Sequence, residues 1–113
     1  MKNVKEFMQK NNLSILAEID VKDNMYYIYK TDQPLAFYSL FEQLILFNNI
    51  ENLLQSLSGQ ILPALWSQGN TNCIICQINK EKLVCVFYDA EQDVRDKYAF
   101  AQRLNEDLVK LLN

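Results

Sequence analysis

The residues of this chain that could carry chemistry are few, and the first candidates are Cys73 and Cys76, which form a Cys-x-x-Cys pair. In isolation this spacing indicates a zinc site or a redox-active dithiol. Both cysteines fall in an apolar run over residues 72–79 that is typical of a strand, where positions three apart point to opposite faces. The two thiols therefore cannot hold one ion. With Cys85 predicted directly opposite Cys76, all three cysteines are interpreted as buried, reduced, apolar side chains, and neither a metal nor a cofactor is expected.

The second candidate group is acidic. Glu18 and Asp20 are two residues apart on a predicted strand, so they share a face, where paired carboxylates could bind a cation or share a proton. The alternative is a solvated surface, which is the commoner role of such a pair. A tyrosine-rich run that contains Tyr26, Tyr27 and Tyr29 could stack on bases or sugars. Because no arginine lies nearby in the sequence, packing between strands explains these tyrosines more simply.

Missing residue types narrow the function further. The chain has no histidine, which removes the usual general base near neutral pH, and its only glycines, Gly59 and Gly69, cannot form a glycine-rich phosphate loop. A net charge of −3 with two arginines argues against a nucleic-acid partner. No apolar run approaches the roughly 20 residues of a membrane span, so no membrane insertion is expected. With no secretory signal and an odd number of cysteines, we expect a cytoplasmic protein.

Hydrophobic periodicity predicts one α+β domain over residues 1–113. The predicted elements are a helix over 3–11, strands over 13–21 and 25–30, a long helix over 35–57, strands over 60–68, 72–79 and 83–88, and a helix from an Asp89/Gln92 capping box to the C-terminus. The fold class is therefore a five-stranded antiparallel sheet in the order αββαβββα.

The long helix over 35–57 is the most informative of these elements. We expect it to be opened by Asp32-Gln33-Pro34 and closed by Ser58-Gly59. It is apolar on two opposite sides, and such a helix must be covered on both. One side is expected on the protein's own sheet and the other against a second chain, which predicts a homodimer; burial beneath the 60–68 strand of the same chain is the alternative. The predicted interface residues are Phe37, Tyr38, Phe41, Ile45, Leu62 and Trp66.

In this order, the elements resemble the roadblock/LC7 family, a branch of the profilin-like and longin-like folds. The resemblance covers nearly the whole chain and is strongest over 83–112, where an apolar strand runs into an amphipathic helix. It implies strand order 2-1-5-4-3, with the long helix on one face and the terminal helices on the other. It also implies a non-catalytic dimeric adaptor, often attached to small GTPases or to motor and signalling complexes. One departure is Pro63, because family homodimers pair the strand that here contains this proline.

Two other functions stay open at this point. One is an assembly or secretion chaperone, which would hold an extended or helical segment of its client in a groove. The other is a small-ligand sensor of related fold, with a pocket between sheet and helix. All three interpretations require a protein or ligand partner that the sequence does not identify.

Overall fold

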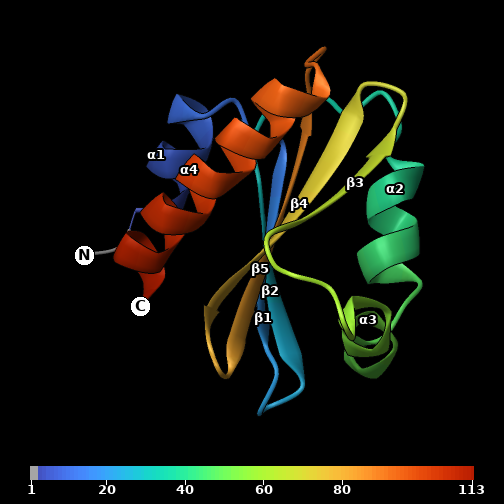
Figure 1. Ribbon diagram of the computed structural model, residues 1–113, viewed down its shortest axis with the longest axis vertical. Coiled ribbons are helices and arrows are strands. Elements are labelled where there is room, and N and C mark those ends of the chain that lie inside the picture. The colour runs from blue at the N-terminus through green and yellow to red at the C-terminus, as the bar shows by residue number, and fades with distance from the viewer. Residues whose placement is uncertain (1–2) are drawn as a thin grey trace.

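The computed structural model of this chain describes residues 3–113 and contains five strands and four α-helices, together with one π-helical segment, η1. The elements are α1 (Val4–Lys10), β1 (Ile15–Asp20), β2 (Met25–Lys30), α2 (Ser39–Phe41), η1 (Glu42–Leu46), α3 (Ile50–Leu57), β3 (Ala64–Gln68), β4 (Thr71–Asn79), β5 (Lys82–Asp89) and α4 (Val94–Leu112). The strands form one antiparallel sheet in the order β2-β1-β5-β4-β3. Helices α1 and α4 cover one face, and α2, η1 and α3 cover the other (Figure 1). The predicted fold class is confirmed.

Two apolar layers hold the helices to the sheet, one on each face. The α2-side core contains Phe41, Ile45, Leu53, Cys73, Cys85 and Phe87, among others. The α4-side core contains Met8, Leu16, Cys76, Val84, Leu104 and Leu108, among others. Strand β5 contributes to both, because its alternate side chains point to opposite faces. Its predicted place at the centre of the sheet, buried on both sides, is confirmed.

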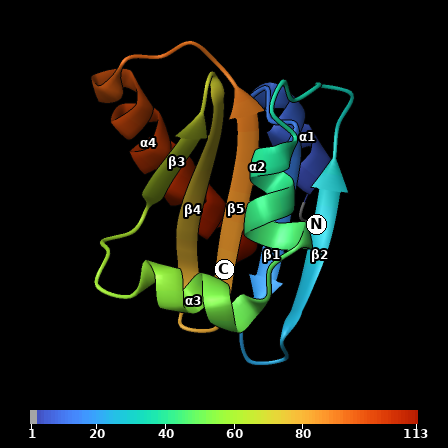
Figure 2. The same ribbon diagram turned by 90° about the vertical axis from the view of Figure 1, so that its right-hand side faces the viewer.

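The predicted long helix over 35–57 is interrupted, so this prediction was wrong in its detail. The segment η1 ends with the Phe47 amide donating to the Glu42 carbonyl at 2.7 Å, five residues back, which widens the last turn. A new helix, α3, then begins where the Asn49 side chain accepts from the Asn52 amide at 2.7 Å. Figure 2 shows the consequence: α2 runs along the strands, while α3 crosses beneath it at an angle. Residues before and after the break therefore do not share one helical face.

The start of the helical segment also differs from the prediction. The amide of Ala36 donates to Asp89 Oδ2 at 2.7 Å and the amide of Phe37 donates to Thr71 Oγ1 at 3.0 Å. The Thr71 hydroxyl in turn donates to the other oxygen of Asp89. These side chains come from the adjoining ends of β4 and β5, so the free amides before α2 are satisfied across the sheet and not by the neighbouring Asp32. Since Asp89 is used here, α4 is capped by Asp93, which accepts from the Asp96 amide at 2.8 Å.

The β4–β5 hairpin has a register one residue away from the prediction. Asn79 lies opposite Lys82 as the turn requires, but an irregularity between Gln77 and Asn79 shifts the ladder beyond it. Cys85 therefore faces Ile75 and not Cys76. An extra residue in one strand of an antiparallel pair has this effect. The bulge places Cys85 on the α2 side, where it joins Cys73.

Two boundaries on the remaining elements also change. Strand β3 begins after Pro63, so the predicted 60–68 strand is shorter and its first residues form a loop. It does lie at an edge of the sheet, as predicted. Helix α4 begins at Val94, after the predicted Asp89/Gln92 capping box, and its buried stripe begins at Ala101, whereas Val94 and Tyr98 are 69% and 55% exposed. In the part of the chain that the structure describes, no helix has the length and apolarity needed to cross a membrane.

Candidate interaction surface

The helical segment from Phe37 to Phe47 leaves four large apolar side chains in contact with solvent. Phe37 and Tyr38 are 41% and 37% exposed before α2, and Leu46 and Phe47 are 42% and 77% exposed at the end of η1. We call these four residues the α2 surface. Tyr38 and Leu46 are separated by about two helical turns, so they point in similar directions. Apolar side chains gathered on one segment in this way are typical of a protein contact site.

Four of the six predicted interface residues are not on this surface, and two of these four are buried, which corrects the prediction. Phe41 is fully buried and Ile45 is 2% exposed, both within the α2-side core. The ring of Phe41 meets that of Phe87 on β5 edge-on, with 5.2 Å between centroids. These residues fix the segment to the centre of the sheet, because its inner side is the one that carries Phe41 and Ile45. The side predicted to face a second chain is thus the side that packs on the protein itself.

The first part of the α2 surface, Phe37 and Tyr38, is held in place by contacts to residues near the two opposite edges of the sheet. The ring of Phe37 covers Gly69, whose φ of +59° places it in the left-handed region; a Cβ there would lie 2.5 Å from Phe37 Cε2. On the other side, Lys30 Nζ donates to the Tyr38 hydroxyl at 3.1 Å and lies 5.4 Å from the centroid of its ring. The orientation of both aromatic rings is therefore set by residues outside the helical segment.

Leu62 and Trp66, the remaining predicted interface residues, lie near the β3 edge. Both are half-buried and pack against the α2-side core, so they cover part of it without being fully enclosed. Ser39 at the start of α2 reaches the same edge, where its hydroxyl donates to Gln68 Oε1 at 3.0 Å. The structure therefore brings Leu62 and Trp66 to the flank of α2, while Phe37 and Tyr38 lie at its beginning.

Several exposed apolar residues were missed by the sequence reasoning. The most extended set is on β2, where Met25, Tyr26, Tyr27 and Ile28 are all at least 36% exposed. The signal was present, because four consecutive apolar residues on a strand place apolar groups on both faces. Ile61, in the loop before β3, is 92% exposed.

The acidic pair on β1 has separate structural roles. Glu18 is 14% exposed and forms an ion pair with Lys82 on β5, with 2.7 Å between Oε1 and Nζ. Asp20 accepts from the Asp23 amide at 3.0 Å and so closes the β1–β2 turn. Glu18 is therefore not a freely solvated carboxylate, which corrects that interpretation.

All three cysteines are free, fully buried thiols. Cys73 and Cys76 lie in different cores on opposite faces of the sheet, as predicted. Burial raises the pKa of Cys73 well above its usual value and that of Cys76 to about 12. Because the thiolate is the reactive form, both are poor nucleophiles. Across residues 3–113, no three histidine, cysteine, aspartate or glutamate side chains gather closely enough to hold a metal ion.

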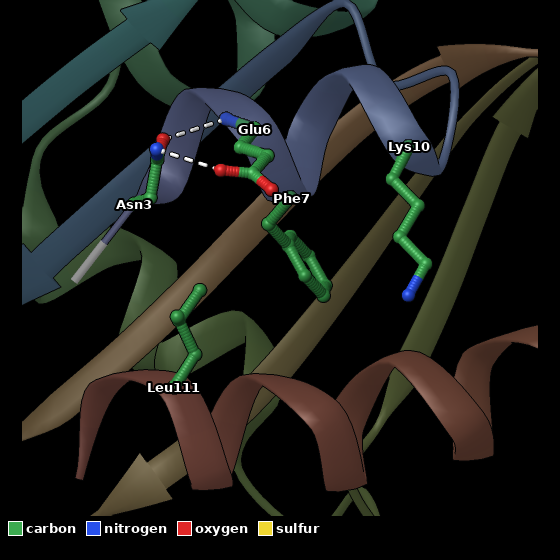
Figure 3. A pocket seen from close by; sticks show the side chains of 5 residues that line it. All are labelled: Asn3, Glu6, Phe7, Lys10 and Leu111. Atoms are coloured by element: carbon green, nitrogen blue, oxygen red, sulfur yellow. Dashed lines mark hydrogen bonds between the residues drawn. The ribbon is translucent and has the colours of Figure 1, made fainter.

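The hollows of the molecule are shallow. One of about 250 Å³ lies between α1 and α4, where Phe7 and Leu111 point into the gap and Glu6 is bonded to Asn3, whose Nδ2 donates to Glu6 Oε2 at 2.9 Å (Figure 3). A larger one of about 470 Å³ lies beside the β3 edge, lined by residues 59–65 and by Tyr98 and Gln102 of α4.

Comparison of the chain with protein-family models and with curated protein sequences gives no match. The function is therefore inferred from the surfaces described above.

Proposed function

We propose that this protein is a non-catalytic adaptor that works as a homodimer and presents its α2 surface to another protein. The observation that carries the proposal is the exposure of Phe37, Tyr38, Leu46 and Phe47 on a segment whose inner side is firmly packed. Leaving such side chains in water forgoes about 25 cal/mol for each Å² of apolar area. A protein contact recovers this free energy, and aromatic residues are enriched in such contacts.

The arrangement of elements supports the same proposal. The strand order β2-β1-β5-β4-β3, with the middle helices on one face and the terminal helices on the other, is the order that the roadblock/LC7 resemblance implies. In this proposal a small GTPase or a signalling complex is the class of partner, on the ground of that resemblance. Because fold and function are separable, the partner class has to be tested on the α2 surface itself.

The experiment combines sedimentation with partner capture. The unmodified protein should sediment as a dimer at micromolar concentration, and a tagged copy should retain its partner from an extract. Phe47→Asp should abolish capture, since a charge would be placed where an apolar side chain is to be enclosed. Val94→Asp is the matched control, because Val94 is 69% exposed against 77% for Phe47 and lies on the opposite layer. Equal capture by both variants, or a monomeric unmodified protein, would refute the proposal.

A second function, a chaperone for a client segment, is favoured by one observation. The hollow of about 470 Å³ beside β3 is lined by Leu62, Leu65 and Tyr98, next to the exposed Ile61. A client side chain could enter it from an extended segment lying along this edge. Fluorescence titration with apolar peptides would test this, because Tyr98→Ala should weaken binding while Phe47→Asp leaves it unchanged.

A further inference from the structure

Strand β2 is an open edge of the sheet that carries apolar side chains on both of its faces. Among residues 3–113 it pairs with β1 alone, and Figure 2 shows it at the free side of the sheet, beyond α2. Met25 and Tyr27 are 49% and 51% exposed on the α4 side, and Tyr26 and Ile28 are 37% and 36% exposed on the α2 side. An apolar strand with one unpaired edge is a template for a further strand.

The usual devices that protect such an edge are missing from β2. All six residues pair with β1 in unbroken register, so no bulge turns the edge away, and the strand has no proline. Its one charged side chain, Lys30, lies at its end. The opposite edge is different, because β3 has five residues and follows directly on Pro63. Of the two edges, β2 is the one suited to accept another strand.

We propose that β2 pairs antiparallel with β2 of a second copy, joining two five-stranded sheets into one. This inference rests on the proposed homodimer and names the contact that forms it. If the two-fold axis is perpendicular to the sheet, the α2 layers of both copies lie on one face of the joined sheet and the α4 layers on the other. Residues paired across the two β2 strands must then point to the same face. Two central registers satisfy this condition. In the first, Tyr27 of one copy pairs with Tyr27 of the other, and Tyr26 lies opposite Ile28. In the second, Ile28 pairs with Ile28 of the other copy, and Tyr27 lies opposite Tyr29. Both registers bring aromatic and aliphatic side chains together across the strands.

Charge at the two ends of β2 points to a second copy as the occupant. Lys30 stands at one end, where its ammonium group donates to the Tyr38 hydroxyl. The turn at the other end runs from Asp20 to Asp23 and is net negative, although it includes Lys22. Antiparallel pairing brings Lys30 of each copy toward the acidic turn of the other, twice by symmetry. A parallel arrangement would place like ends together. Such self-complementarity is what a two-fold contact requires.

The experiment measures dimer affinity by analytical ultracentrifugation of the full chain. Ile28→Lys should raise the dimer Kd by at least about 30-fold, since it puts a charge into an apolar strand contact. Val94→Lys, at an exposed apolar site on α4, should leave it unchanged. Lys30→Asp should also weaken the dimer, and adding Asp23→Lys should restore it. If Ile28→Lys fails to fold, the variants at Lys30 and Asp23 still test the proposal, because both of these residues are exposed.

The results separate this inference from the proposed function. Protection of β2 amides from hydrogen exchange in the dimer, lost on dilution, is the expected result. A dimer that survives Ile28→Lys and the Lys30 variant but dissociates with Phe47→Asp would overturn β2 pairing while keeping the homodimer. A dimer whose β2 amides exchange freely would also overturn it and leave this edge for an extended segment of another protein. A monomeric unmodified protein would refute both.

Discussion

Replacing Thr71 with valine tests how the sheet positions the α2 surface. Thr71 is fully buried, and its hydroxyl links two groups: it accepts from the amide of Phe37 at 3.0 Å and donates to Asp89. Asp89 also accepts from the amide of Ala36 at 2.7 Å. Valine keeps the shape of threonine but has no hydroxyl, so both hydrogen bonds are lost without a large cavity.

The size of the effect follows from the burial of the two partners. An intramolecular hydrogen bond contributes about 0.5–1.5 kcal/mol net, and one to a charged group about 1.5–3 kcal/mol. Both hydrogen bonds are only partly buried, so water can replace the lost partner and values near the low ends apply. We expect Thr71→Val to lower the free energy of unfolding by about 2 kcal/mol. In a domain with a total stability of roughly 5–15 kcal/mol, the protein stays folded.

The assay is urea denaturation of the unmodified protein, Thr71→Val and Thr71→Ser. Serine retains the hydroxyl, so it should cost distinctly less than valine. Combining Thr71→Val with Asp89→Ala should cost less than the sum of the two, because each removes the hydrogen bond between these side chains. Hydrogen exchange should show faster opening around Leu40 and Phe41 in Thr71→Val. If valine is as stable as serine, or the double variant is additive, this network does not anchor the segment.

Two other changes test the contact between Gly69 and Phe37 and the burial of Cys76. Gly69→Ala should lower the melting temperature and shift the NMR signals of the Phe37 ring. The new Cβ would lie 2.5 Å from that ring, and alanine would have to adopt the φ of +59° of Gly69. An unchanged melting curve would contradict this contact. Burial raises the pKa of Cys76 to about 12, because the folded protein favours the neutral thiol. The stability of the fold should therefore be unaffected by this thiol's ionisation below about pH 9 and should decrease as pH rises from there toward 12. Urea titrations over that interval should show the free energy of unfolding falling with pH, by about 1.4 kcal/mol per unit for each such group, and Cys76→Ala should reduce the slope; identical slopes would show that this thiol ionises freely.

The strands were predictable because their hydrophobic pattern has a period of two residues and turn-forming residues mark their ends. The alternation over residues 13–21 and the apolar run from Leu83 to Tyr88 each match an observed strand within one or two residues. The register of β4 against β5 was not predictable, since one extra residue near Gln77 moves every pair beyond it. A bulge of this kind leaves no mark in the hydrophobic pattern, because both faces of β4 are buried.

The candidate surface was predicted only in part, for a related reason. Apolar spacing showed that the segment from Phe37 to Phe47 has more apolar area than one contact can use, but it could not show which side packs inward. Phe41 and Ile45 were assigned to a partner, although the structure buries both in the α2-side core, with Phe41 against Phe87. A helical wheel gives the separation of two stripes and not their orientation toward the rest of the chain.

The sequence by itself determined the fold class, the absence of histidine-based chemistry, and the opposite placement of Cys73 and Cys76, because each depends on composition or on local periodicity. Tertiary structure alone decided where the helical segment begins, which of its sides is exposed, and which sheet edge is open. The start of the segment depends on Thr71 and Asp89, which are distant from it in sequence and meet it only when β4 and β5 are paired. The open edge depends on the order of all five strands. Local patterns record what each element needs to bury, whereas the choice of partner depends on where the remaining elements lie.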